Sequence, residues 1–154
     1  MIVVADTSPI TALLRIKKAD LLLELFEEIS IPEAVRSELL RYHHSLPRWL
    51  VVGTAQNESE LSKLRIELDA GEAEAIILAQ EIQSDYLLMD ERKGRRIAMS
   101  KGLRVIGLLG IVLLAKERKS ISSAREMLAE LEKTAGMYLA SSLRETALRS
   151  VGEK

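Results

Sequence analysis

The chain has 154 residues and a formal net charge of −1, so any attraction to a polyanion must come from a local patch. A content of 47% hydrophobic and 29% charged residues is typical of one globular domain with a single core and excludes a disordered chain. The absence of cysteine excludes disulfides and thiolate metal sites, and an aromatic content of 3% argues against base stacking as the main mode of nucleic-acid binding.

The first expected element is a buried strand over residues 2–5, a short apolar run rich in β-branched side chains. It ends at Asp6, and Thr7, Ser8 and Pro9 then form a turn into an apolar helical pattern. In an open parallel sheet the ligand crevice lies outside the carboxyl ends of the strands, so Asp6 is a candidate site residue. The alternative is that Asp6 merely caps the helix.

Two strands and a helix are expected next. Residues 17–26 continue the first helical pattern, and residues 29–31 form a second short strand. Pro32 opens a helix, because proline is favoured at the first helical position. Glu38 lies beside the apolar stripe of this helix, which makes it a second candidate. Residues 49–52 are the third predicted strand.

The second informative stretch is the start of another helix. After a charged amphipathic helix over residues 57–68, Gly71 interrupts the pattern, and a new apolar helix is expected from about Glu72. At about 100° per residue, Asp69 and Glu72 project toward its apolar face, whereas Glu74 projects nearly opposite. A carboxylate on the buried side needs a partner, so Glu72 is the third candidate and Asp69 its alternative.

A fourth buried strand, over residues 86–89, ends at an acid as the first one does, which makes Asp90 the fourth candidate. The helix that follows is basic, and its cations are positioned where a phosphate backbone could lie; the alternative is a solvated face. These cations are Arg92, Lys93, Arg95 and Arg96. A fifth strand is expected over residues 104–108.

The alternation of strands and helices, without a hairpin dipeptide such as Asn-Gly, predicts a three-layer α/β/α sandwich with a mainly parallel sheet of about five strands. Asp6 and Asp90 should then end neighbouring central strands. An apolar stripe over residues 124–143 predicts one or two C-terminal helices. They are expected to pack on the same domain or on a partner.

The four acids become informative if they converge. Their mutual repulsion is costly in a partly buried cleft, and a divalent cation is the usual remedy. Ligands that are all oxygen indicate Mg²⁺ or Mn²⁺ and not zinc. An all-carboxylate site of this kind suits metal-assisted phosphodiester hydrolysis. For any single acid, a solvated or capping role is the alternative.

Five segments occur in a particular order: VVADTSPI at 3–10, PEAVRSELL at 32–40, LDAGEAEAIILA at 68–79, LLMDERKGRRIA at 87–98 and GLRVIGLLGIVLLAKERKSI at 102–121. Together they resemble PIN-domain proteins, the fold of VapC-type toxin ribonucleases, and more closely a PIN-like branch of bacteria and archaea. The resemblance implies that four acids bind the metal and serve catalysis, with Asp69 as a further candidate ligand. These acids are Asp6, Glu38, Glu72 and Asp90.

The sequence departs from the family pattern at three places. The third acid is usually Asp, and here it is Glu72. The usual Asp-Thr-Asn start is Asp6-Thr7-Ser8, which keeps hydroxyl groups that are candidates for substrate binding, with helix capping as their alternative. The segment after Ser122 has no counterpart in the short toxins. We therefore expect a PIN-like nuclease domain over residues 1–121 and a C-terminal helical extension over residues 122–154.

The resemblance implies a metal-dependent endoribonuclease that is the toxin of a type II toxin-antitoxin pair, with RNA, an antitoxin and a second copy of the chain as partners. The alternative is a catalytically inactive PIN-like module for interaction or nucleic-acid binding. No stretch reaches the roughly 20 apolar residues of a membrane span, and no basic segment precedes the first apolar run, so a cytoplasmic protein without a membrane partner is expected.

Overall fold

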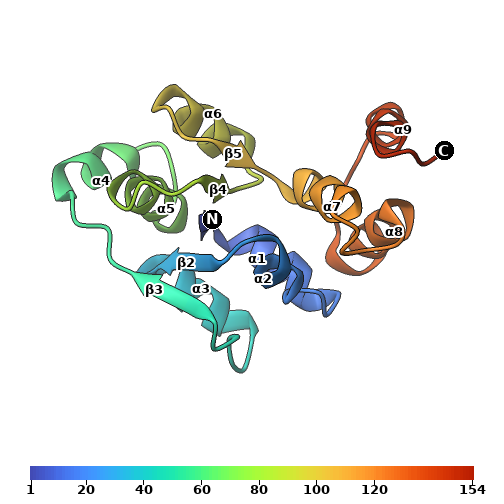
Figure 1. Cartoon of the computed structure of the whole chain (residues 1–154). Helices are drawn as coiled ribbons and strands as arrows, with labels where there is room; N and C mark the ends of the chain where they lie inside the picture. The colour runs from blue at the N-terminus through green and yellow to red at the C-terminus, as the bar shows by residue number, and fades with distance from the viewer.

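The computed structural model describes residues 1–154, and a five-stranded, all-parallel sheet with the order β3-β2-β1-β4-β5 lies at its centre (Figure 1). The strands are β1 (Ile2–Ala5), β2 (Glu28–Pro32), β3 (Leu50–Gly53), β4 (Tyr86–Leu88) and β5 (Val105–Ile106). The central strand β1 pairs with β2 and β4, as expected if Asp6 and Asp90 follow neighbouring strands. The predicted sandwich with a mainly parallel sheet of about five strands is confirmed.

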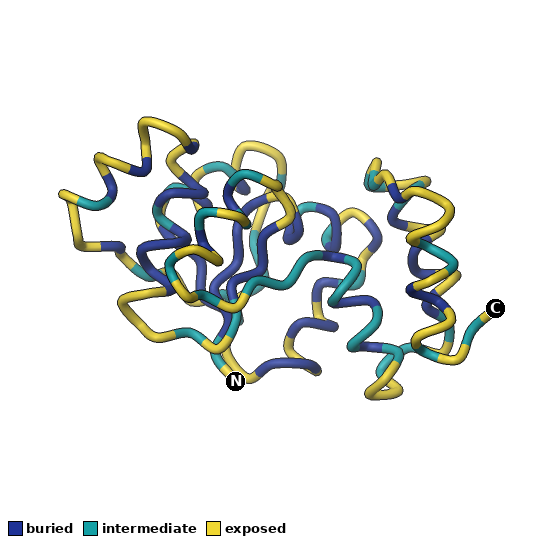
Figure 2. Tube along the Cα trace, turned by 90° about the horizontal axis from the view of Figure 1, so that it is seen from above, coloured by how far each residue is buried: buried dark blue, intermediate teal, exposed yellow.

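Helices cover both faces of this sheet and bury most of the central strands β1, β2 and β4, while the edge strands β3 and β5 stay partly exposed (Figure 2). None of them has the length and apolar character that crossing a membrane requires. The helices are α1 (Thr7–Arg15), α2 (Leu21–Leu25), α3 (Glu33–Tyr42), α4 (Glu58–Leu64), α5 (Ala70–Glu81), α6 (Arg92–Ser100), α7 (Leu108–Glu117), α8 (Ala124–Ala135) and α9 (Ser141–Ser150).

The alternation of side chains along β1 explains the two layers of helices. Val3 and Ala5 point into a core cluster that they share with α1, α2, α3, α7 and α8. Val4 points into a second cluster, shared with α4, α5 and α6. Both faces of the strand are therefore buried, which is why its sequence is an uninterrupted apolar run.

The helix expected to continue over residues 17–26 is interrupted, so this expectation was wrong. Lys17 has a φ of 60°, and its N–H and that of Lys18 donate to the carbonyls of Leu14 and Leu13 at 3.1 and 2.9 Å. These two bonds form the Schellman arrangement that ends helices, in which the left-handed residue is usually glycine. Because a lysine takes that position, the sequence carried no stop signal.

The C-terminal helices pack on their own chain, at the end of the molecule opposite α4 (Figure 1). Met127, Leu128 and Leu131 of α8 are buried in the cluster that contains α1 and α7, and α8 contacts both helices. Tyr138 and Leu143 stay 88% and 50% exposed. Most of the apolar stripe is thus used within the chain, while the division at residues 121 and 122 stays a prediction.

Candidate functional site

Asp6 lies at the carboxyl end of β1, where strand gives way to α1. Its backbone N–H donates to the Leu88 carbonyl of β4 at 2.9 Å, which fixes the end of β1 beside the end of β4. The residue is only 6% exposed. Although Asp6 occupies the N-cap position of α1, its side chain accepts no capping hydrogen bond. Helix capping therefore does not account for this buried carboxyl group.

The protonation of Asp6 is strongly perturbed by its surroundings. Burial raises the pKa of its carboxyl group from the ordinary 3.8 to about 7, against a lowering influence of the Thr7 backbone N–H. The charges of three further acids contribute to the rise, namely Asp69, Glu72 and Glu38. These carboxylates therefore lie close enough to repel a charge on Asp6. Perturbation by burial together with like charges is typical of functional sites.

Glu38 reaches this cluster from α3. Its Oε2 accepts a hydrogen bond from Thr7 Oγ1 at 3.1 Å, so the first residue of α1 orients the carboxylate. A Cβ atom on Gly71 would lie 3.2 Å from Glu38 Oε2 and 3.4 Å from Asp6 Oδ1. The two carboxylates thus face one small space that the absent side chain of Gly71 leaves open. The sequence pattern alone indicates only a helix break at Gly71.

Asp69 and Glu72 begin α5 as a capping box. The Glu72 N–H donates to Asp69 Oδ1 at 2.8 Å, and the Asp69 N–H donates to Glu72 Oε1 at 3.2 Å. The helix consequently starts at Ala70 and not at about Glu72 as expected. Each carboxylate uses one oxygen for the cap and keeps the other. Burial raises the pKa of Glu72, and the charges of Asp69 and Glu91 act in the same direction.

Two neighbouring acids differ in their relation to this cluster. Glu91, which caps α6 through the Gly94 N–H at 2.6 Å, also lies close to Glu72 and was not a candidate from the sequence. In the sequence, the only feature that indicates a role for Glu91 is its position directly after Asp90. Glu74 accepts the Ala34 N–H at 3.1 Å and pairs with Arg65 at 3.5 Å. It is not among the acids that raise the pKa of Asp6.

Asp90 follows β4, but its carboxylate makes other contacts. Oδ1 accepts the Leu108 N–H at 2.9 Å. The same oxygen and Arg95 Nη1 lie 2.6 and 2.8 Å from the position that a Cβ on Gly107 would occupy, so the carboxyl group is enclosed although the residue is exposed. This enclosure raises the pKa of Asp90, against the Leu108 hydrogen bond and the charge of Arg95. Asp90 is not one of the acids that act on Asp6.

The cations predicted to contact phosphate differ in whether they already pair with other groups of the chain. A cavity of about 400 Å³ beside Asp90 is lined by Arg92, Arg95 and Arg96. Arg95 Nη1 donates to the Met89 carbonyl at 2.9 Å, and Lys93 lies 3.9 Å from Glu67. Arg92 and Arg96 form no salt bridge. They are therefore the cations of α6 that are available to an anion.

The chemistry of the carboxylates fits a hard divalent cation. Every donor is an oxygen, and Asp6 and Glu38 border the open space next to Gly71. No group of three His, Cys, Asp or Glu side chains is close enough to hold one ion together. Joint binding therefore requires a carboxylate to rotate, and Glu38, which is only half-buried, has room to do so.

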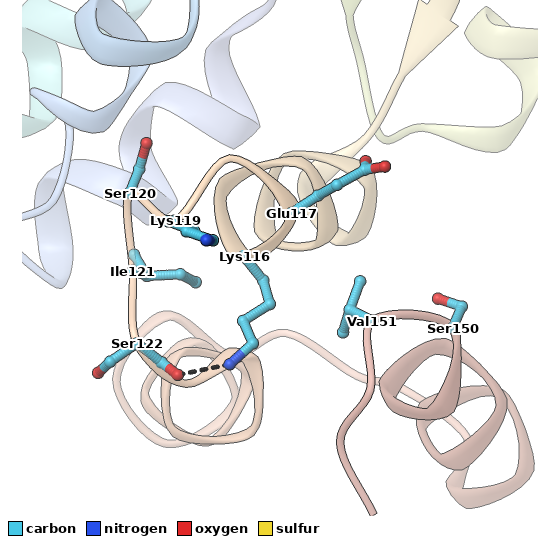
Figure 3. A pocket seen from close by; sticks show the side chains of 8 residues that line it. All are labelled: Lys116, Glu117, Lys119, Ser120, Ile121, Ser122, Ser150 and Val151. Carbon is cyan, nitrogen blue, oxygen red and sulfur yellow. Dashed lines mark hydrogen bonds between the residues drawn. The ribbon is translucent and has the colours of Figure 1, made fainter.

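A cavity of about 610 Å³ lies far from these acids, between the ends of α7 and α9 (Figure 3). Its Lys116 donates to the Ser122 carbonyl at 2.6 Å and pairs with Glu153 at 3.4 Å. Glu153 in turn accepts the Ala124 N–H at 2.7 Å. These contacts hold residue Glu153 against the start of α8 and engage Lys116, one of the three charged residues that line the cavity.

Comparison with known proteins gives one match. A protein-family model described as a PIN domain matches residues 2–153. None of the curated proteins and none of the solved structures matches the chain significantly. The match includes the carboxylate cluster and also α8 and α9.

Proposed function

The chain belongs to the PIN-domain family, and on that basis we propose that it is a divalent-metal-dependent endoribonuclease that hydrolyses RNA phosphodiester bonds. PIN domains are generally nucleases and typically use divalent metals. The observation that carries the proposal is the group of acids around Asp6, whose charges oppose its ionisation in a buried position. Without a cation, such a group of acids destabilises the folded state, and a bound cation would offset the repulsion between the carboxylates.

In this proposal the acids share the metal-binding work. Asp6, Glu38 and Glu72 would hold Mg²⁺ or Mn²⁺, with Asp69 as a further ligand. Asp90 would join them after its carboxylate turns from the Leu108 N–H. When bound, the cation supplies Lewis-acid activation of water and of the scissile phosphate. Thr7 holds Glu38 in orientation through its 3.1 Å hydrogen bond.

Substrate binding would involve the groups that flank these acids. Arg92 and Arg96 would pair with backbone phosphates, because neither forms an ion pair within the chain. Arg95 would help to position Asp90, since it lies beside that carboxylate, and Lys93 would contribute weaker attraction. Ser8, exposed at the start of α1, is a further candidate contact for the RNA.

We further propose that this nuclease is the toxin of a type II toxin-antitoxin pair in the cytoplasm and that it forms a homodimer. Support for the toxin role comes from the family resemblance. Support for self-association comes from the exposed apolar residues Tyr138 and Leu143 near the C-terminus. A small gene overlapping this one would favour the toxin role, because it would be the candidate antitoxin gene. Light scattering of the full chain would measure the oligomeric state.

A second candidate function is an inactive PIN-like module that binds nucleic acid or protein. The observation that favours it is the engagement of Asp90 by the Leu108 N–H and Arg95, which keeps this carboxylate away from Asp6. Such a module would bind RNA through α6 without cleaving it.

The test is cleavage of a labelled single-stranded RNA with Mn²⁺, with Mg²⁺ and with EDTA. Wild type should cleave only with a divalent cation, and Asp6→Asn should lower the rate at least 100-fold, a loss on the scale of several kcal/mol of barrier. Asp20→Asn is the matched control, because Asp20 only accepts the Trp49 Nε1–H and asparagine keeps an acceptor there. Equal cleavage by wild type and Asp6→Asn would reject the proposal, and RNA binding without cleavage would favour the inactive module.

A further inference from the structure

A groove of about 270 Å³ lies between α1 and α3 and includes Glu38 of the carboxylate cluster among its lining residues. Residues spaced by four share one face of a helix, and that spacing brings polar side chains of both helices to the groove. They are Thr7, Thr11 and Arg15 from α1, and Glu38 and Tyr42 from α3. We call this the α1–α3 groove.

The α1–α3 groove leads away from the acids. Both helices start at the carboxyl edge of the sheet, and Thr7 and Glu38 are joined there by their hydrogen bond. Arg15 follows eight residues after Thr7, which is about 12 Å along the helix axis. Ala135, at the end of α8, also lines the groove. A ligand in the groove would therefore lie directly beside the acids and extend toward Tyr42 and Arg15.

Two side chains at the far end of the groove lack partners within the chain. Tyr42 is 67% exposed, as is otherwise seen only for Tyr138 among the five aromatic residues, and its ring stacks on no other ring. Arg15 is exposed and forms no salt bridge. An exposed aromatic face and a free guanidinium are the groups that bind a base and a phosphate of single-stranded nucleic acid.

A contact between the two helices lies in the middle of the groove. Thr11 Oγ1 is 3.4 Å from His43 Nε2, which links the middle of α1 to the end of α3. The volume of the groove is slightly below the range of pockets that enclose a drug-sized ligand, so it suits a single nucleotide.

We propose that the α1–α3 groove is a nucleotide-binding subsite, in which one base of the RNA strand stacks on Tyr42 and an adjacent phosphate pairs with Arg15. The proposal rests on the ribonuclease function above and specifies how the strand is held on one side of the carboxylate cluster. A single stacked base agrees with the low aromatic content, since the rest of the strand is held through phosphates. Tyr42 is then a substrate-binding residue that influences which base lies next to the scissile bond.

The test measures binding of a fluorescein-labelled single-stranded RNA to the full chain by anisotropy, in EDTA so that metal-dependent cleavage does not interfere. Tyr42→Ala should weaken binding between about 5-fold and 150-fold, the effect of losing one stacked base. Tyr42→Phe should retain wild-type affinity, because phenylalanine keeps the aromatic face. Ile66→Ala is the control for removing an exposed apolar side chain, since Ile66 is 84% exposed and lies between α4 and α5.

Arg15→Gln provides an independent readout. A lost phosphate contact should reduce the slope of log affinity against log salt by about 0.7 for a single strand. The matched control is Arg149→Gln on α9, which removes an exposed arginine outside the groove and should leave the slope unchanged.

The outcomes separate the subsite from the ribonuclease function. Wild-type affinity in Tyr42→Ala would overturn the subsite even if the protein cleaves RNA with Mn²⁺. Tyr42-dependent binding without cleavage in Mn²⁺ would support the subsite and reject the nuclease. Absence of RNA binding by wild type would overturn the subsite. Unchanged circular dichroism spectra of all variants would exclude loss of folding as the cause of a weaker affinity.

Discussion

Replacing Asp6 by asparagine should make the metal-free protein more stable at pH 8, although it should also greatly slow the proposed RNA cleavage. The carboxyl group of Asp6 is buried among other acids, and its pKa is raised to about 7. The folded state therefore holds a proton that the unfolded state has released between about pH 4 and pH 7. The stability contributed by this proton is fully present below 3.8 and is lost as the pH rises through about 7.

The size of this effect follows from the two pKa values. At about 1.4 kcal/mol for each pH unit, the rise from 3.8 to about 7 corresponds to roughly 4 kcal/mol. Asparagine resembles the protonated acid in size and carries no charge. The free energy of unfolding of Asp6→Asn should therefore equal that of wild type near pH 4 and exceed it by up to about 4 kcal/mol at pH 8. In a domain of this size, that corresponds to about 8–16 °C in Tm.

The assay is thermal unfolding in EDTA at pH 4, 6 and 8 for wild type, Asp6→Asn and Asp20→Asn. The difference in Tm between wild type and Asp6→Asn should grow with pH, because only wild type must ionise the buried Asp6 carboxyl group. Other titrating groups contribute to both proteins and cancel in the difference. Asp20→Asn should follow wild type, since Asp20 is exposed. A destabilised Asp6→Asn at pH 8, or a difference that does not change with pH, would refute the assignment of a repelled, buried carboxylate.

Three further predictions concern the cluster and the C-terminal helices. Gly71→Ala should weaken Mn²⁺ binding measured by calorimetry, because the new Cβ lies within 3.4 Å of both Asp6 Oδ1 and Glu38 Oε2; unchanged affinity would contradict this placement. Leu128→Ala should lower the free energy of unfolding in urea by about 2–5 kcal/mol, since this side chain is fully buried in the main core; a loss below 1 kcal/mol would indicate a separable extension. Glu153→Gln should cost about 1 kcal/mol in the same assay, because its carboxylate caps α8 and pairs with Lys116; no loss would show that this contact is not formed in solution.

The fold could be predicted largely because the strands carry local signals. Val3 and Val4 point to opposite faces and are both buried, so the first strand reads as a continuous apolar run. Strand β1 lies between β2 and β4 because the strand order reverses there, as in doubly wound sheets. The end of α1 could not be predicted, since it depends on a left-handed Lys17 and not on a glycine.

The sequence predicts which acids are candidates for the site, but not how their side chains lie relative to one another. Asp6 and Asp90 were identified by their positions after buried runs. The direction of the Asp90 carboxylate depends on Leu108, eighteen residues away in the sequence, and no local pattern encodes that contact. The closeness of Glu91 to Glu72 likewise results from the packing of α5 against α6. The periodicity of the sequence therefore does not predict side-chain contacts between different helices and strands.

The acids around Asp6 are proposed to bind a divalent cation, and isothermal titration of the 154-residue chain with Mn²⁺ at pH 8 measures that binding. We expect saturable binding by wild type and Asp20→Asn, with at least a tenfold loss of affinity, about 1.4 kcal/mol, in Asp6→Asn. Wild-type affinity in Asp6→Asn, or no binding by wild type, would reject the proposed metal site.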